Sequence, residues 1–282
     1  MQRLAQSLIG AAVRSGNGMV PRHASSDGGF SWKASLVPSL DFYGRRHQPV
    51  ETLIRLSNGL LLMPTDNASK PSGTAIHLSA DNGRSWVDPG GNIAGLHGAV
   101  AELKNGSLLA FGRNHDGPCP GQPSKSCMAQ SVSHDLGKSF SYSTSPFPGI
   151  HAGQRETLLR LAEGPLMMTG YANSNEKPEV YPQLLVKTVT GKLRPVYGLY
   201  AAVSYTDGST WEAHKLISDN SATGHEVESM DGKLFTMNRT HSDPGGYTAA
   251  KQGPDGRIHV ITSRQHFIFN LAWLLEPSPD LA

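Results

Sequence analysis

The sequence predicts an all-β protein: a β-propeller built from four-stranded antiparallel blades. Two observations carry this prediction. An octapeptide that ends in an aromatic residue occurs four times, and so does a segment that reads strand, tight turn, strand. Together they give four strands in about 54 residues, the period typical of propeller blades. The alternative is an ordinary β-sandwich whose turns are similar by chance, and it would not explain copies at a constant offset.

The composition agrees with many short strands and turns. Of the 282 residues, 31 are glycine and 19 are proline, whereas only 17% are charged. This balance argues against coiled coils and long surface helices. The formal net charge of +2 comes from scattered basic residues, so we expect no nucleic-acid partner. No apolar run approaches the roughly 18 residues of a membrane span, so we expect none.

The octapeptide follows the pattern Ser-x-Asp-x-Gly-x-Ser/Thr-aromatic. Its copies begin at Ser25, Ser79, Ser133 and Ser204, which are 54, 54 and 71 residues apart. In the fourth copy, Thr206 stands where the others carry aspartate, and Asp207 follows it. An aspartate in such a turn accepts backbone N–H bonds, and the aromatic ring can be buried between blades. We therefore expect these aspartates to stabilise outer hairpins rather than to catalyse a reaction.

The hairpin repeat divides the chain. "ETLIRLSNGLLLM" (51–63) matches "ETLLRLAEGPLMM" (156–168), and looser copies begin at Gly98 and Thr248. Each is interpreted as two strands joined by an Asn-Gly or Asp-Gly type of turn. "HEVESMDGKLFTMN" reads as a further hairpin. We interpret residues 1–282 as one domain, with a partial blade at 1–36, three full blades within 45–217 and closing strands at 218–275.

The two cysteines are close in sequence. Cys119 and Cys127 flank a short polar stretch over which a loop closes easily, so we favour a disulfide over two free thiols. A disulfide favours an oxidising compartment, and we expect a secreted or periplasmic protein. The N-terminal stretch itself reads as a poor signal peptide.

The hairpin turns set a register that groups four residues. Val50, His97, Arg155 and Tyr247 each stand nine residues before the glycine of a hairpin turn. Equivalent positions of neighbouring blades face the same central space at one rim of the ring. Three of the four are polar, which core positions rarely are. We weigh a functional site here against plain structural hydrogen bonds, and we expect His97, Arg155 and Tyr247 to converge on one pocket.

The octapeptides look like Asp boxes, and the chain resembles the sialidase superfamily of Asp-box, or BNR-repeat, propellers over nearly its whole length. Segments such as "GRRHQPVETLIRL" and "SPFPGIHAGQRETLLRLAEGP" look like a bacterial sialidase-like group of uncertain substrate. The resemblance implies a six-bladed ring when complete, with blades upstream of residue 1. Such a ring needs about 24 strands, and we count roughly 17 to 19, so we expect a partial chain.

The resemblance also implies an activity. It points to an exo-glycosidase, a sialidase- or neuraminidase-like hydrolase of terminal acidic sugars, with a tyrosine as nucleophile. Tyr247 stands where the family's tyrosine would, and Glu226 resembles its glutamate partner, with Glu228 as the runner-up. The family's acid/base aspartate lies in an early blade, so Asp116 is a substitute by position only. His97 is a further catalytic candidate.

An acidic sugar also needs guanidinium groups, which bind a carboxylate through paired hydrogen bonds. The residues that we expect to bind substrate are Arg155, Arg46, Gln48, Arg113, Arg239, Arg264 and Gln154. The family's Arg-Ile-Pro stretch has no match, because this chain reads Pro49-Val50-Glu51 there. That departure argues against strict sialic-acid specificity.

The remaining patterns favour neither metal nor cofactor. The twelve histidines show no His-x-x-x-His or Cys/His ligand spacing, and we predict no metal site and no cofactor. The expected partner is a glycan or a small acidic sugar. Two other functions stay open, because a fold does not determine function. One is a polysaccharide lyase, in which Tyr247 with His97 or Arg155 removes a proton beside a uronate carboxylate. The other is a non-catalytic glycan-binding propeller.

Overall fold

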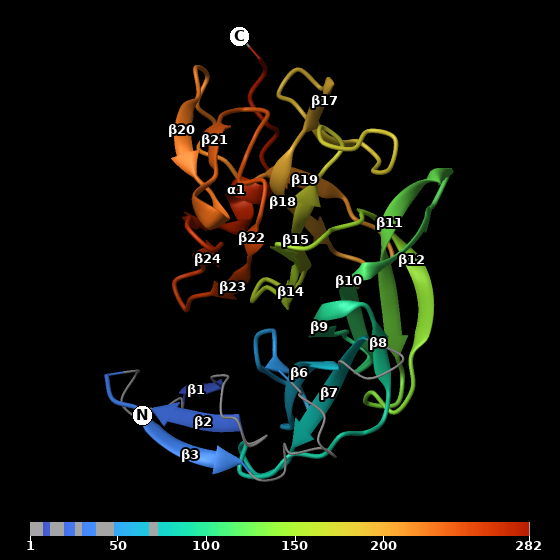
Figure 1. Cartoon of the computed structure of the whole chain (residues 1–282), viewed down its shortest axis with the longest axis vertical. Coiled ribbons are helices and arrows are strands. Elements are labelled where there is room, and N and C mark those ends of the chain that lie inside the picture. The colour runs from blue at the N-terminus through green and yellow to red at the C-terminus, as the bar shows by residue number, and fades with distance from the viewer. Residues whose placement is uncertain (1–7, 12–19, 26–29, 38–47, 68–72, 282) are drawn as a thin grey trace.

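The computed structural model describes residues 8–11, 20–25, 30–37, 48–67 and 73–281. Within these ranges the chain forms successive antiparallel sheets that follow one another around a common centre (Figure 1). The predicted all-β propeller fold is therefore confirmed. In the described part of the chain, no helix is long and apolar enough to cross a membrane.

The first sheet precedes the full blades. It has three antiparallel strands, which are β1 (Leu8–Ala11), β2 (Val20–Ser25) and β3 (Lys33–Val37). The sequence predicts only the second half of a blade in this region, so the structure adds one strand to that expectation. Residues 26–29 of the first octapeptide lie outside the described residues.

Three full blades follow, the first with five strands and the other two with four. In the first, β4 (Gln48–Pro49), β6 (Leu61–Asn67), β7 (Gly73–Ser79) and β8 (Asn92–Ala94) pair in that order, and β5 (Ile54–Arg55) also pairs with β6. The second contains β9 (Leu96–Glu102), β10 (Leu108–Cys119), β11 (Gln122–Ser133) and β12 (Ser141–Pro148). The third contains β14 (Thr157–Arg160), β15 (Leu166–Ala172), β18 (Gly198–Ser204) and β19 (Ala213–Leu216).

Two hairpins accompany the third blade. β16 (Leu184–Lys187) and β17 (Leu193–Val196) form an insertion between β15 and β18 that the sequence did not predict. β20 (His225–Glu228) and β21 (Leu234–Met237) form the hairpin predicted from "HEVESMDGKLFTMN".

The last sheet contains β23 (Ala249–Gln252), β24 (Ile258–Ile261) and β25 (His266–Phe269). The chain then forms a short helix, α1 (Leu271–Leu275), where strands were predicted up to residue 275. The helix begins there because the side chain of Asn270 caps its first turn by accepting a hydrogen bond from the backbone N–H of Trp273. Within the described residues, β25 pairs with β24 and no other strand.

The second, third and fourth octapeptides each occupy the turn between the last two strands of a full blade. Asp81 accepts hydrogen bonds from the backbone N–H groups of Arg84 and Ser85 and from two serine hydroxyls, which hold the pKa of its carboxyl far below the usual range. Trp211 of the fourth copy lies between blades, with its ring 4.9 Å from that of Phe147 in β12. The structural role predicted for the octapeptides is confirmed.

The core lies between neighbouring blades. Phe111, Met168 and Tyr200 are completely buried in one cluster that joins the second blade, the third blade and the last sheet. Each sheet therefore depends on its neighbours for burial of its faces. The two cysteines lie on the long β10–β11 hairpin and form the predicted disulfide between Cys119 and Cys127.

Candidate active site

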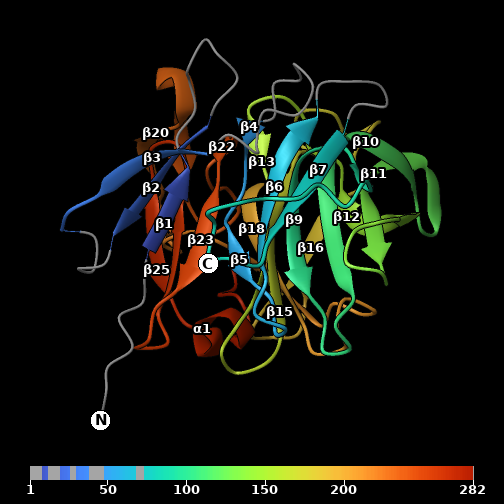
Figure 2. The same cartoon turned by 90° about the horizontal axis from the view of Figure 1, so that it is seen from below.

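The residues of the predicted rim gather at one end of the ring. In each full blade, the hairpin turn joins the first strand to the second, and the octapeptide joins the third strand to the fourth. Because neighbouring strands are antiparallel, both turns lie at the same end of the ring, opposite to the rim. Figure 2 shows β4, β13 (Gln154–Arg155) and β22 (Gly246–Tyr247) at one end and α1 at the other. We refer to the end with β4, β13 and β22 as the mouth and to the other as the turn end.

A short parallel strand pair places an arginine beside a tyrosine at the mouth. β13 pairs with β22 in parallel, with Arg155 opposite Tyr247, and the N–H of Gly246 donates to the carbonyl oxygen of Gly153 at 2.8 Å. The Cζ atom of Arg155 lies 4.7 Å from the centroid of the Tyr247 ring. Tyr247 is 40% exposed, so its ring is accessible from solvent despite this contact.

The second blade contributes a histidine and a further arginine. The ring of His97 meets the Tyr247 ring edge-on, with centroids 5.3 Å apart, and the Cζ atom of Arg113 lies 5.6 Å from the Tyr247 centroid. Arg113 is buried, and its Nη1 donates to the carbonyl oxygen of Gln154 at 2.9 Å. The expected convergence of His97, Arg155 and Tyr247 is therefore present, and Arg113 joins them.

An aspartate from the first blade holds His97. The backbone N–H of His97 donates to Oδ1 of Asp66 at 2.7 Å, and its Nδ1 lies 2.8 Å from Oδ2 of the same carboxylate. His97 has a φ of 55°, a left-handed conformation that is unfavourable for a residue with a Cβ atom. Strained backbone that is held by neighbouring groups is common at functional sites. The two contacts with Asp66 fix the orientation of the imidazole ring.

Two glutamates are buried behind the arginines. Oε1 of Glu51 lies 3.6 Å from Nε of Arg155, and burial raises the pKa of Glu51 to about 8 although Arg155 lowers it. Glu156 is completely buried, and neither of its carboxyl oxygens has a hydrogen-bond partner within the described residues. Burial, with a smaller contribution from the nearby Glu51, raises the pKa of Glu156 well above its usual value.

These pKa shifts determine the charge of the mouth. Because burial raises the pKa of Glu51 to about 8 and also raises the pKa of Glu156, the protonated forms are favoured, and these do not cancel the charges of Arg113 and Arg155. The mouth therefore presents two guanidinium groups around a phenol, an arrangement suited to a ligand that carries a carboxylate.

Sequence reasoning missed both glutamates. Each is the first residue of a repeated segment, "ETLIRL" or "ETLLRL", eight residues before the glycine of its hairpin turn. The signal was present, since a glutamate at equivalent positions of two blades directly follows the rim register of Val50 and Arg155. It was interpreted only as part of the strand pattern.

Two of the expected catalytic carboxylates lie apart from Tyr247. Asp116, on the β10–β11 hairpin, accepts a hydrogen bond from Oγ of Ser126 at 3.1 Å, and partial desolvation raises the pKa of its carboxyl. Glu226, on β20, is exposed, and its side chain makes no hydrogen bond or ion pair to Tyr247 or to any other described residue. The catalytic roles of Asp116 and Glu226 remain predictions that this geometry does not support.

Two of the expected substrate-binding arginines have other partners. Arg239 donates to the backbone carbonyl oxygens of Asn220 and Asp280, at 3.3 and 2.8 Å. Nη2 of Arg264 lies 3.0 Å from the carboxylate of Glu228, the runner-up glutamate, and both side chains are about half exposed. Neither arginine contacts the Tyr247 ring within the described residues.

The remaining candidates lie behind or outside the site. The buried side chain of Gln154 donates to Oδ1 of Asn173 at 2.7 Å and to the carbonyl oxygen of Pro244 at 2.8 Å, so it supports β13. Arg46 and the side chain of Gln48 lie outside the described residues. No group of three or more metal-ligating side chains is found in the described part of the chain.

Comparisons with solved structures identify the fold. An intramolecular trans-sialidase from Ruminococcus gnavus, solved with oseltamivir carboxylate, matches with a TM-score of 0.54 and 14% identity, over 91% of this chain and 51% of that chain. A Hadza microbial sialidase matches with a TM-score of 0.58 and 14% identity, over 91% and 45%. A mutant of the NanB sialidase from Streptococcus pneumoniae matches with a TM-score of 0.50 and 15% identity, over 90% and 36%.

These solved structures share the propeller fold with this chain, which spans about half of their length or less. A comparison with curated proteins found no match. The model of the BNR repeat-like domain matches residues 7–260, which is most of the sequence. The chain therefore belongs to the BNR repeat-like domain family.

Proposed function

We propose that this protein is a sialidase-like glycoside hydrolase that removes terminal acidic sugars from glycans. The observation that carries the proposal is the exposed phenol of Tyr247, with the guanidinium groups of Arg155 and Arg113 4.7 and 5.6 Å from its ring centroid. The fold, which is shared with solved sialidases, supports it.

The charge of the mouth selects the substrate class. A sugar carboxylate can accept paired hydrogen bonds from a guanidinium group, and two such groups converge here. The raised pKa values of Glu51 and Glu156 favour their neutral forms, which leave these positive charges in place. A neutral terminal sugar would gain nothing from the two arginines, so the proposal specifies an acidic one.

A phenol is a suitable nucleophile beside such a substrate. Neutral before reaction, it is not repelled by the sugar carboxylate as an aspartate or glutamate would be. In the proposed step the Tyr247 oxygen gives up its proton and bonds to the anomeric carbon, the glycosidic bond breaks, and the leaving oxygen takes up a proton from solvent. Water then attacks the anomeric carbon: its hydroxyl group goes to the sugar, its remaining proton returns to the tyrosine oxygen, and the phenolic proton removed in the first step goes back to solvent. We assign the role of accepting the phenolic proton to His97, because its ring contacts Tyr247 and Asp66 orients it.

The test compares the wild-type protein with Tyr247→Phe on α-sialosides, glucuronides and galacturonides. We expect the wild type to release a free reducing sugar from at least one of them. Tyr247→Phe should lose turnover by about a thousandfold or more, because the nucleophile is gone. Tyr205→Phe, at an exposed tyrosine of the turn end, is the matched control and should retain full turnover.

The products distinguish the proposal from its alternatives. A lyase would yield an unsaturated uronate that absorbs in the near ultraviolet, and a glycan-binding propeller would yield no product. Either result, or full turnover by a folded Tyr247→Phe variant, would contradict the proposed function. Circular dichroism spectra of the variants establish that they are folded.

A further inference from the structure

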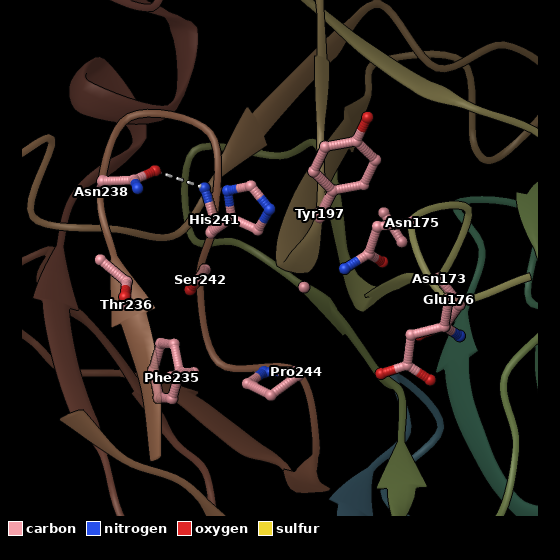
Figure 3. A pocket seen from close by; sticks show the side chains of 12 residues that line it. Asn173, Asn175, Glu176, Tyr197, Phe235, Thr236, Asn238, His241, Ser242 and Pro244 are labelled. Atoms are coloured by element: carbon pink, nitrogen blue, oxygen red, sulfur yellow. Dashed lines mark hydrogen bonds between the residues drawn. The ribbon is translucent and has the colours of Figure 1, made fainter. Parts of the chain in front are cut away.

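A cavity lies beside β13, the strand that carries Arg155. Its volume is about 440 Å³, within the range of small-molecule pockets. The end of β15, the start of β18 and residues 235–244 form its walls (Figure 3). Figure 3 shows Tyr197, Asn175 and Glu176 on one side, with Asn238, Thr236 and Phe235 on the other. None of these residues belongs to the group around Tyr247.

Backbone contacts build the walls of this pocket. Tyr197 and His241 form a parallel bridge, in which the N–H of Ser242 donates to the carbonyl oxygen of Tyr197 at 2.9 Å. Gly198 has a φ of +87°, and a Cβ atom there would lie 2.3 Å from the carbonyl oxygen of Ser242. Only glycine allows this close approach. The pocket is therefore held by paired backbone rather than by side chains alone.

Most polar groups that line the pocket are neutral, and several of them have no hydrogen-bond partner within the described residues. Within the described residues, the hydroxyl groups of Tyr197 and Thr236 and the side-chain amide of Asn175 have no hydrogen-bond partner. Oδ1 of Asn238 accepts from the backbone of Thr240 and His241, which leaves its NH2 group free. Hydroxyl and amide groups both donate and accept, as the hydroxyl groups of a sugar do.

Aromatic rings and charges restrict the ligand further. The Tyr197 and His241 rings lie 4.9 Å apart, and with Phe235 they supply an apolar surface for the C–H face of a sugar ring. Burial lowers the pKa of His241, so its imidazole is neutral at neutral pH. Glu176 is the one charged residue among those lining the pocket, and Nε2 of His151 lies 3.7 Å from its carboxylate. The lining contains no arginine or lysine that would bind an anion.

Gln154 connects the pocket with the candidate site. Its side chain donates to Asn173 and Pro244, both of which line the pocket, whereas the side chain of Arg155 lies against Tyr247. Successive side chains of a strand point to opposite sides. The pocket and the site therefore lie on the two sides of β13.

We propose that this pocket is a second binding site, for a neutral sugar unit. Which molecule supplies that sugar unit rests on the proposed function: we assign it to an inner sugar of the same glycan whose terminal acidic sugar binds at Tyr247. The binding of a neutral sugar does not depend on that function, because none of the lining residues takes part in the proposed reaction.

The first experiment measures binding without turnover. Neutral methyl glycosides of galactose, glucose, mannose and N-acetylglucosamine are titrated into the wild-type protein and followed by ligand-observed NMR. Tyr197→Ala should weaken the binding of the preferred glycoside about tenfold, because an aromatic surface and a hydroxyl group are lost. Tyr205→Ala is the matched control, since Tyr205 follows the other end of β18, and it should bind like the wild type. The proposal is overturned if no glycoside binds, or if both variants weaken binding equally.

The second experiment identifies the source of the sugar. The terminal acidic sugar is offered once on an aryl group and once on a neutral disaccharide. If the pocket holds an inner sugar, Tyr197→Ala should raise KM about tenfold for the disaccharide substrate alone. An unchanged KM with weakened glycoside binding would mean that the pocket takes a separate glycan, and it would overturn the inner-sugar origin. Glycoside binding with no turnover of either substrate would refute the proposed function and leave the pocket assignment intact.

Discussion

The pKa values of carboxyl groups are shifted in opposite directions at the two ends of the ring. At the turn end, Asp135 accepts hydrogen bonds from the hydroxyl groups of Ser133 and Ser139 and from the N–H of Ser139, which lower its pKa to about 2. At the mouth, Glu156 is completely buried, its oxygens have no hydrogen-bond partner in the described residues, and its pKa is raised. The carboxyl group is thus stabilised as an anion at one end, whereas burial at the other end favours its protonated form.

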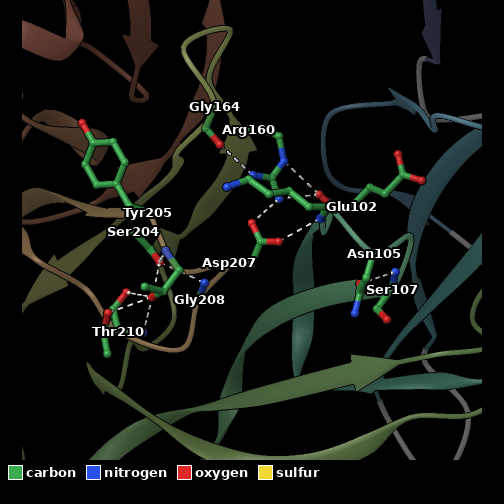
Figure 4. A network of polar contacts seen from close by, with 12 residues as sticks. Glu102, Asn105, Ser107, Arg160, Gly164, Ser204, Tyr205, Asp207, Gly208 and Thr210 are labelled. Atoms are coloured by element: carbon green, nitrogen blue, oxygen red, sulfur yellow. Dashed lines mark hydrogen bonds and ion pairs between the residues drawn. The ribbon is translucent and has the colours of Figure 1, made fainter.

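The turn end also shows how neighbouring blades are joined. The N–H groups of Ser57, Lys104 and Ala162 occupy equivalent positions, two residues before the glycine of a hairpin turn. Each donates to a side chain of the next blade or sheet, namely Glu102, Asp207 and Gln252, at 2.7 to 2.9 Å. Different residues therefore perform one structural task around the ring. Figure 4 shows the connection that Asp207 makes to the second blade.

At the mouth, equivalent positions have different chemistry instead. Val50, His97, Arg155 and Tyr247 share one register, yet they are an apolar residue, an imidazole, a guanidinium and a phenol. A site with a buried carboxyl group that has no hydrogen-bond partner, Glu156, and a strained histidine, His97, costs folding free energy. Strongly perturbed carboxyl groups in a cleft are a feature of functional sites. This contrast supports our proposal that the mouth carries the function, whereas the turn end contributes stability.

The largest expected effect concerns Glu51 and pH. Its pKa in the folded protein, about 8, lies above its ordinary value of 4.5. Folding therefore favours the protonated form, and this contribution to stability is complete below about pH 4.5 and lost as pH rises through about 8. The loss is on the order of 5 kcal/mol at most. We expect Glu51→Gln to flatten this part of the pH dependence of the unfolding free energy, measured in urea.

The control for this prediction is Glu226→Gln, at an exposed carboxylate, which should follow the wild-type curve. If Glu51→Gln also runs parallel to the wild type between about pH 5 and about pH 9, the carboxyl group of Glu51 is ionised throughout. The mouth would then lack the charge contrast with the turn end that we describe.

The next effect is on activity. Arg155→Ala should reduce kcat/KM for an acidic sugar about a hundredfold or more, which is about 3 kcal/mol of transition-state stabilisation, because the guanidinium group nearest to Tyr247 is removed. Arg264→Ala is the control, since Arg264 is half exposed and paired with Glu228. Its kcat/KM should change less than about threefold. Equal losses of kcat/KM in both variants would indicate that Arg264 also binds substrate, as the sequence predicts.

At the turn end the effect should be on stability alone. Arg160 donates to the carbonyl oxygens of Glu102 and Gly164 and to the carboxylate of Asp207 at 2.7 to 3.2 Å (Figure 4). Arg160→Met should therefore lower the unfolding free energy by about 2 kcal/mol and leave kcat per folded molecule unchanged. The exposed pair of Arg257 with Asp255 offers a control, because Arg257→Met should cost less than about 0.5 kcal/mol. A loss of kcat in folded Arg160→Met would show that the two ends are coupled.

The two ends also differ in how far the sequence predicts them. At the turn end, local pattern was sufficient, because the octapeptide aspartates bind residues three or four positions away, as Asp81 does with Arg84 and Ser85. The mouth was predicted in outline, since the hairpin register placed His97, Arg155 and Tyr247 together. Its electrostatics were not predicted. Glu51 lies between β4 and β5 and Glu156 between β13 and β14, and the burial of their side chains arises only when neighbouring blades close over them.

Tertiary contacts also explain the candidates that do not join the site. Arg239 was chosen by residue type and position, but its guanidinium donates to the carbonyl oxygens of Asn220 and Asp280. Asp280 lies 41 residues further along the chain. Glu226 was chosen by resemblance, and the structure leaves it exposed on β20 without a partner in the described residues. Residue type and order along the chain do not contain these long-range partners.

The smallest expected effect tests the repeat itself. In the fourth octapeptide, Oγ1 of Thr206 takes the place of the aspartate and accepts from the N–H of Thr210 at 2.8 Å. A carboxylate at this position could also accept from the hydroxyl of Thr210, but that hydroxyl already donates to Glu212 at 2.5 Å. We expect Thr206→Asp to change the unfolding free energy by less than about 1 kcal/mol, because the new hydrogen bond is offset by repulsion from Glu212.

Adding Glu212→Gln should remove the repulsion, so the double variant should be more stable than Glu212→Gln alone in urea unfolding. If the aspartate gives no gain in that background either, the threonine already satisfies this turn, and the aspartate of the octapeptide is not required for its fold.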